Sequence, residues 1–130
     1  MSVSHQRPRA HHVEHRGASG HRLAGSRYAP EGEARGVALL LHGGGQTRHA
    51  WDATAARLAD QGFVAISVDQ RGHGDSAWVR DKRYSFFDFS EDARCLAAQI
   101  EADEGAAPAV IGASMGGVAS MLALGRSPRC

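Results

Sequence analysis

The sequence predicts a doubly wound α/β fold, in which helices cover both faces of a mostly parallel sheet. Three short apolar runs, each the length of a buried parallel strand, occur at 37–42, 63–68 and 107–113. Segments with helical periodicity separate these runs, and the first two runs end in polar, glycine-rich turns. Upstream, Gly-Ala-Ser-Gly at 17–20 predicts an antiparallel hairpin that precedes the parallel strands.

Two helices are expected between the parallel strands. Residues 50–61 carry apolar side chains at three- to four-residue spacing and end before Gly62, which is typical of a glycine C-cap. A second helix is expected to open at Ser90, an N-cap followed by the acidic residues Glu91 and Asp92. Its predicted apolar face contains Ala93, Leu96, Ala97 and Ile100.

Length and composition indicate one globular domain. The chain has 130 residues, of which 42% are apolar, and a formal net charge of +1, which gives no reason to expect nucleic acid or an acidic membrane as partner. No apolar stretch approaches the ~20 residues needed to span a bilayer, and the N-terminus lacks the apolar core of a signal peptide. We expect a disordered tail over 1–10 and a domain over 11–130. Two cysteines, Cys95 and Cys130, form no disulfide framework, which favours a cytoplasmic location.

The candidate nucleophile lies in Gly-Ala-Ser-Met-Gly-Gly at 112–117. The pattern G-x-S-x-G is that of a nucleophile elbow, a sharp strand-to-helix turn that exposes the serine hydroxyl, here Ser114. Gly112 and Gly116 flank the serine, where larger side chains would collide with the crossing strand and helix. The alternative interpretation is a turn of small residues selected only for close packing.

A candidate oxyanion element follows the first parallel strand. His42 and Gly43 open the run His-Gly-Gly-Gly at 42–45, a flexible turn that can aim a backbone N–H at a developing oxyanion. The expected donors are the N–H groups of Gly44 and of Met115, the residue after the serine. The alternatives are a plain glycine-rich loop or a phosphate cradle. A Walker phosphate loop would need G-K-[ST] and a dinucleotide fold would need G-x-G-x-x-G, and neither pattern occurs here.

Together with Asp-Gln-Arg-Gly-His-Gly-Asp-Ser at 69–76, these motifs give the chain a clear resemblance. It resembles the N-terminal half of an α/β-hydrolase over residues 11–125, and the 69–76 segment is similar to the family's D-x-R-G-x-G-x-S loop. The fold class is therefore a partial α/β-hydrolase fold with an N-terminal antiparallel hairpin. The resemblance implies a serine hydrolase for esters or similar acyl compounds, in the branch that holds esterases, lactonases, C–C hydrolases and cofactor-free haloperoxidases.

The resemblance also implies that the acid and the histidine of the triad follow the serine in the chain. No carboxylate and no histidine follows Ser114 in this sequence, so we expect an incomplete fragment that is inactive alone. The resemblance implies that His42 orients its loop and that the 69–76 loop is structural. A rescue by His73 as a local base is the alternative, with Asp69, Asp75 and Asp88 as available carboxylates.

A second functional class is a non-catalytic, hydrolase-like binding or interaction module. We expect a small ester-like substrate, no cofactor, no nucleic acid and no membrane, with self-association through the exposed apolar edge at 107–113. No metal site is predicted, although His11 and His15 would share one face of a strand and permit metal binding at that edge. The resemblance places the aromatic-rich loop 77–87 near the pocket mouth, where it either lines an acyl site or covers the core. Cys95 is interpreted as a small packing residue.

Overall fold

A computed structural model describes residues 10–77 and 85–113 of the chain. Five strands form one sheet in the order β1-β2-β4-β3-β5. The strands are β1 (Ala10–Arg16), β2 (Arg22–Tyr28), β3 (Val37–Leu41), β4 (Val64–Val68) and β5 (Ala109–Gly112). The helices are α1 (Asp52–Asp60) and α2 (Phe86–Glu104), with 3-10 turns η1 (Ala18–Gly20) and η2 (Arg48–Trp51).

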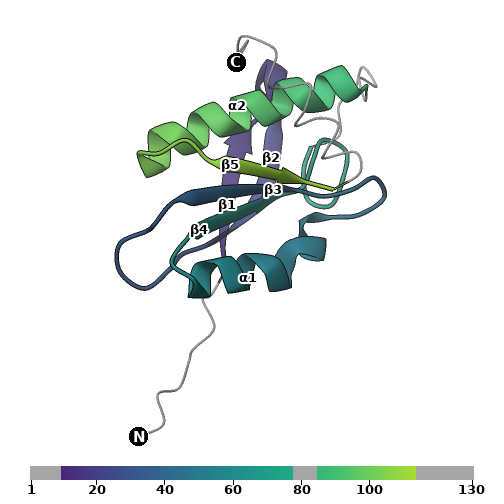
Figure 1. Cartoon of the computed structure of the whole chain (residues 1–130). Helices are drawn as coiled ribbons and strands as arrows, with labels where there is room; N and C mark the ends of the chain where they lie inside the picture. Colours follow the sequence, from purple (N-terminus) through teal and green to yellow (C-terminus); the bar gives the residue numbers. More distant parts are fainter. Residues whose placement is uncertain (1–9, 78–84, 114–130) are drawn as a thin grey trace, which may run out of the picture.

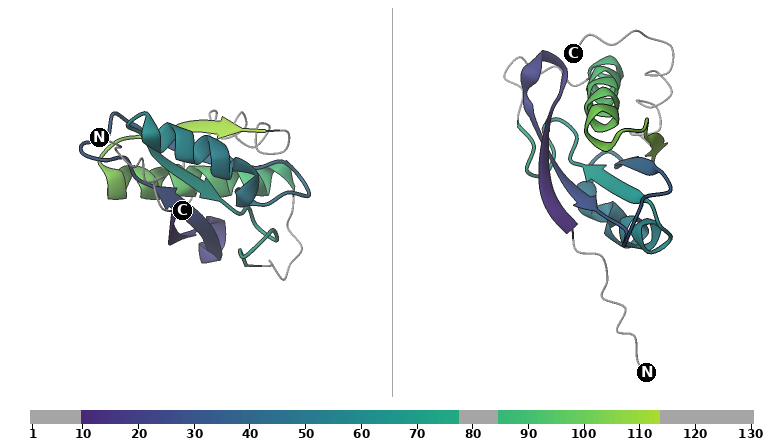
Figure 2. Two further views of the ribbon diagram at one scale, coloured as in Figure 1. Left: turned by 90° about the horizontal axis from the view of Figure 1, so that it is seen from below. Right: turned by 90° about the vertical axis from the view of Figure 1, so that its left-hand side faces the viewer.

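The sheet is doubly wound, as the sequence predicts. β3 pairs in parallel with both β4 and β5, whereas β1, β2 and β4 are joined by antiparallel pairing. Helix α1 covers one face of the sheet and α2 covers the other (Figures 1 and 2). The three predicted parallel strands and the N-terminal hairpin are therefore confirmed, and the hairpin turn contains Ser19 and Gly20 in the left-handed region, at φ 67° and 80°.

The core is divided into two layers because neighbouring residues of a strand point to opposite faces. Leu39 and Ile66 pack on the α2 face, in a cluster that includes Leu96 and Ile100. Leu40 and Ala65 point the other way and meet Ala55 and Ala59 of α1. Every residue of β3 and β4 is buried, which explains why both strands read as continuous apolar runs.

Helix α2 begins earlier than the sequence predicted. Its N-cap is Ser85, whose hydroxyl accepts from Asp88 N (3.2 Å) while the Asp88 carboxylate accepts from Ser85 N (3.0 Å). This capping box stabilises a first turn that contains Phe86 and Phe87, so the predicted loop over 77–87 is wrong at its C-terminal end. Ser90, predicted as the N-cap, is fully buried within the helix, and its hydroxyl donates to Phe87 O (2.8 Å).

Three further observations concern the remaining expectations. Val110 and Ile111 of β5 are 39% and 37% exposed, and within the described residues β5 pairs with β3 only. This strand is therefore an exposed edge, and self-association through it stays a prediction. Cys95 is fully buried and disulfide-bonded, so the expected absence of a disulfide is wrong. Over 10–77 and 85–113, neither helix has the length and apolarity that crossing a membrane requires.

Candidate active site

The predicted site residues that the structure describes, His42, Gly43, Gly44 and Gly112, lie at the carboxyl ends of the parallel strands. The 42–45 turn follows β3 and the 69–76 loop follows β4, and parallel pairing places both at one edge of the sheet. Gly112, the first residue of the predicted elbow, pairs with Leu41, and Ala113 N donates to Leu41 O (3.1 Å). The elbow therefore starts beside the glycine turn. Ser114, Met115 and Gly116 lie outside the described residues, so their predicted roles stay predictions.

His42 joins the two loops. Its ring is completely buried, Nδ1 donates to Gly43 O (2.8 Å), and Nε2 accepts from Gln70 N (3.0 Å). The Gln70 amide returns a hydrogen bond to His42 O (2.8 Å). Burial lowers the pKa of His42, opposed by the bond to Gly43 O, so the ring is neutral at neutral pH. With both nitrogens engaged, His42 orients the glycine turn and is unsuited to act as a base.

The glycine turn leaves the N–H groups of Gly44 and Gly45 exposed. The Gly43 N–H is occupied by Gln46 Oε1 (3.0 Å), and Gln46 N donates back to Gly43 O (3.2 Å). Gly45 has φ +74°, a conformation that favours glycine. Gly44 is exposed, and in the described part of the chain its N–H has no hydrogen-bond partner. The predicted oxyanion donor, Gly44, is thus one of two residues of this turn whose N–H is available to a ligand, and Gly45 is the other.

A buried arginine that the sequence did not single out connects the same loops. Arg48 N donates to Asp69 Oδ1 (2.6 Å), and the Arg48 guanidinium donates to Asp69 Oδ2, to Asp75 Oδ2 (3.0 Å) and to Ser26 Oγ (2.8 Å). Arg48 and Asp69 are both buried. Nothing in the local pattern marks Arg48 as buried, because its partners are supplied by β2 and by the loop after β4.

The 69–76 loop is held by its own motif residues. Asp69 is fully buried and also accepts from Asp75 N (3.0 Å), while Ser76 Oγ donates to Asp69 O and accepts from Ala24 N (2.8 Å). Gly74 has φ +50°, and a Cβ there would lie 2.7 Å from Asp69 Oδ1 and closer still to Oδ2. These contacts support the structural role that the resemblance implied for the loop. They also engage the Asp69 carboxylate, so it is not available as the acid of a catalytic triad.

Arg71 of the same motif fastens the loop to helix α2 and to the hairpin. Its guanidinium makes a bidentate pair with Asp92, from Nε to Oδ2 (2.7 Å) and from Nη2 to Oδ1 (2.8 Å). Asp92 also accepts from Ala18 N (2.9 Å) in the hairpin turn, and His21 Nε2 lies 3.3 Å from Oδ2. Asp92, predicted as a first-turn charge of the helix, is therefore a buried residue that joins α2 to two other segments, the 69–76 loop and the hairpin turn.

The remaining candidate groups have different environments. His73 Nδ1 donates to Arg71 O (2.9 Å), and its ring lies 4.9 Å from the His42 ring, centroid to centroid. Asp75 is exposed, and the Arg48 guanidinium lowers its pKa. Asp88 caps helix α2. Within 10–77 and 85–113, no group of three or more histidine, cysteine, aspartate and glutamate residues is arranged to hold a metal ion.

Comparisons with known proteins agree with this arrangement. The sequence model for the family described as "Serine aminopeptidase, S33" matches residues 32–130. An esterase from Mycobacterium tuberculosis is 38% identical over 90 residues, which cover 69% of this chain and 28% of the esterase. A monoacylglycerol lipase from Mycolicibacterium smegmatis is 31% identical over 102 residues, which cover 78% of this chain and 36% of the lipase.

Solved structures share the same fold. The structure of an α/β-hydrolase from Novosphingobium aromaticivorans superposes with a TM-score of 0.73 at 28% identity, covering 87% of this chain and 38% of that one. The 130-residue chain thus spans 28% and 36% of the length of the two curated relatives.

Proposed function

We propose that this chain, which belongs to the α/β-hydrolase family, carries the nucleophile and the oxyanion donors of a serine hydrolase for small esters. The observation that carries the proposal is the pairing of Leu41 with Gly112. This pairing supports the proposal because the turn that contains Gly44 and the start of the G-x-S-x-G segment leave the sheet at the same edge. The likeness to an esterase and a monoacylglycerol lipase supports an ester as the substrate class.

The proposed chemistry is acyl transfer through Ser114. The serine oxygen attacks the ester carbonyl carbon while a general base takes the hydroxyl proton, and the N–H groups of Gly44 and Met115 stabilise the resulting oxyanion. When the tetrahedral intermediate collapses, the base returns the proton to the departing alcohol. Water then attacks the acyl-serine ester, which releases the carboxylic acid and regenerates the serine.

The base must be a group other than those that fix the loops. Both nitrogens of His42 are engaged, and the Asp69 and Asp92 carboxylates are committed to Arg48 and Arg71. In the family order, the acid and the histidine follow the serine, and this sequence contains neither after Ser114. We therefore propose that Ser114 becomes a strong nucleophile only in a polypeptide that supplies these two residues.

Hydrolysis of 4-nitrophenyl butyrate tests the proposal. The 130-residue chain should hydrolyse the ester at nearly the background rate, and Ser114→Ala should change that rate by less than about twofold. The comparison uses a longer protein in which the same residues are followed by a carboxylate and a histidine in the family order. There, Ser114→Ala should lower kcat by at least about 10⁴-fold, whereas the matched control Ser120→Ala should leave kcat within about threefold.

Three results would contradict the proposal in different ways. If the longer protein kept its activity after Ser114→Ala, the nucleophile would be wrong. If the 130-residue chain showed a high rate that Ser114→Ala and His73→Gln each abolished, Ser114 would stand but the base would be His73. If the longer protein bound the ester and never turned it over, the non-catalytic binding module would be the better description.

A further inference from the structure

Gln46 bonds to both polar groups of Gly43 and so closes the glycine turn after β3. The Gln46 backbone N–H donates to Gly43 O (3.2 Å), and the side-chain oxygen Oε1 accepts from Gly43 N (3.0 Å). The His42 ring donates a further hydrogen bond from Nδ1 to Gly43 O (2.8 Å). Gly43 is buried, so these neighbours take the place of water as its hydrogen-bond partners.

The hydrogen bonds between Gly43 and Gln46 define the conformation of the turn. A bond from the fourth residue to the first, with a negative φ at Gly44 and φ +74° at Gly45, is typical of a type II turn over 43–46. The two central residues, Gly44 and Gly45, are exposed, and within 10–77 and 85–113 their N–H groups have no hydrogen-bond partner. The direction of these two N–H groups therefore depends on how Gly43 is held.

The space beside Gly44 is open to a ligand. In the described structure, a Cβ at this position would meet no atom within 4 Å, and the negative φ is one that any residue type adopts. Neither the packing nor the backbone conformation of the turn accounts for a glycine here. A glycine does allow a ligand to approach the backbone closely. The proposed oxyanion needs that approach, since its oxygen must lie about 3 Å from the Gly44 nitrogen.

We propose that Gln46 is a positioning residue of the oxyanion turn, whose side-chain oxygen holds Gly43 so that the Gly44 N–H keeps a fixed direction. This role rests on the proposed acyl-transfer function and adds to it a residue that acts without touching the substrate. If the Gln46 acceptor is removed, the Gly43 N–H becomes a buried donor without a partner, which is unfavourable. The turn then rotates to expose that N–H to water, and the Gly44 N–H moves with it.

The kinetic effect of such a rotation differs from that of a loss of fold stability. Charge on the carbonyl oxygen grows as the serine attacks, so an oxyanion donor acts mainly in the transition state. Misplacing the Gly44 N–H should therefore lower kcat and leave KM nearly unchanged. A residue that only stabilised the fold would change neither value in the folded enzyme.

Hydrogen exchange of the 130-residue chain, followed by NMR, tests the bond from Gly43 to Gln46 without any activity. The Gly43 N–H should exchange at least about tenfold more slowly than the Gly44 N–H. Gln46→Met removes the acceptor at similar length and should accelerate exchange at Gly43 at least about fivefold. Gln46→Glu keeps an acceptor oxygen at the same place and should preserve the protection. The proposal is overturned if Gly43 is unprotected in the unaltered chain, or if the two variants do not differ in this way.

Ester hydrolysis by the longer protein, in which a carboxylate and a histidine follow Ser114, tests the positioning role. Gln46→Met should lower kcat at least about tenfold and leave KM within about threefold. Gln61→Met is the matched control, because Gln61 is also exposed and lies just after α1, at the end of β4 remote from the glycine turn. Both kinetic constants of this control should stay within about twofold.

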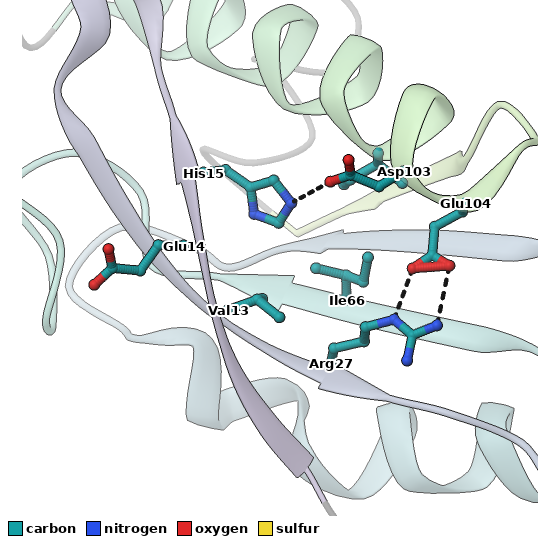
Figure 3. Close-up of a pocket in the computed structure, with 8 residues that line it drawn as sticks. Val13, Glu14, His15, Arg27, Ile66, Asp103 and Glu104 are labelled. Carbon is teal, nitrogen blue, oxygen red and sulfur yellow. Dashed lines mark hydrogen bonds and ion pairs between the residues drawn. The ribbon is translucent and has the colours of Figure 1, made fainter.

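A second control separates loss of stability from loss of position. Arg27 and Glu104 form an ion pair with hydrogen bonds of 2.6 and 3.0 Å, beside a cavity of about 180 Å³ (Figure 3). In the same cavity His15 Nε2 lies 4.0 Å from Asp103 Oδ2. Helix α2 leads from the loop end of β4 back to the start of β5, so this cavity is remote from the 42–45 turn (Figure 1). Arg27→Gln should lower the unfolding midpoint but leave kcat within about twofold.

The kinetic outcomes distinguish this proposal from the proposed function. Ser114-dependent activity that Gln46→Met leaves unchanged, or a change confined to KM, overturns the positioning role while the proposed function stands. An equal loss of kcat in Arg27→Gln also overturns it, since reduced stability would then explain the effect. Activity that survives Ser114→Ala overturns the proposed function itself, and the positioning role with it, whatever the exchange at Gly43 shows.

Discussion

Arg48 and Asp69 form a buried pair that fastens the loop after β3 to the loop after β4. The Arg48 backbone N–H donates to one carboxylate oxygen of Asp69 over 2.6 Å, and its guanidinium donates to the other. Because Asp69 is fully buried, the carboxylate depends on these donors and on Asp75 N for its stabilisation. The pair therefore fixes the spacing between the glycine turn and the 69–76 loop.

Asp69→Asn should destabilise the fold strongly. The variant removes the buried anionic partner of the Arg48 guanidinium and leaves it only the exposed Asp75 carboxylate, and breaking a buried pair in this way costs about 3 kcal/mol or more. Urea unfolding followed by far-ultraviolet circular dichroism would measure the change. Asp75→Asn removes the other carboxylate on the same guanidinium and is the matched control. Since that side chain is 68% exposed, the unfolding midpoint should change little, and equal losses in the two variants would show that burial is not the cause.

Gly74→Ala should be far more damaging than Gly45→Ala. Both glycines have positive φ, +50° and +74°, so both substitutions strain the backbone by about 1 kcal/mol. At Gly45 a Cβ meets nothing within 4 Å, but at Gly74 it overlaps the Asp69 carboxylate. We expect a total loss of about 3 kcal/mol for Gly74→Ala, measured as the difference in unfolding free energy. Similar losses at the two positions would contradict the observed packing of the loop.

Asp92→Asn should loosen the hairpin together with the 69–76 loop. Asp92 accepts two hydrogen bonds from Arg71 and one from Ala18 N, and all three weaken when the carboxylate loses its charge. A loss of about 3 kcal/mol is expected, with faster hydrogen exchange in the 17–21 turn as well as in the loop. Glu101→Gln, on the exposed side of the same helix, is the control and should leave both segments unchanged.

The free energy of unfolding should decrease as the pH falls below neutrality, because His42 is buried as a neutral ring. Burial lowers the pKa of this ring in the folded state, so the unfolded chain binds the proton more tightly. The contribution of the neutral ring is complete above about pH 6.5 and is lost progressively as the pH falls below that value. The NMR titration midpoint of His42 should lie below 6.5, and His42→Gln should flatten the dependence of unfolding free energy on pH between 7.5 and 5. A midpoint above 6.5 would contradict this assignment.

The amino-acid sequence by itself determined the fold class and the place of the candidate site. Short, β-rich apolar runs bounded by glycine-rich turns are typical of strands buried on both faces, as β3 and β4 are, and such turns mark the carboxyl edge of a parallel sheet. The N-terminal hairpin could also be predicted from the sequence, because Gly-Ala-Ser-Gly at 17–20 is a local turn pattern. Local patterns were less reliable at helix ends, where Ser90 resembled an N-cap but Ser85 and Asp88 supplied the stronger capping box.

Only the tertiary structure decided which charged residues are buried and what they join. Arg48 finds Asp69 across 21 positions, and Asp92 finds Ala18 across 74, distances over which no periodicity carries information. The structure likewise showed that Gly43 is already bonded while Gly44 is exposed, and that His15 is enclosed near Asp103. These facts depend on how loops and strand edges meet in space. Side-chain type and spacing determine the elements, and the packing between elements determines what each polar group contacts.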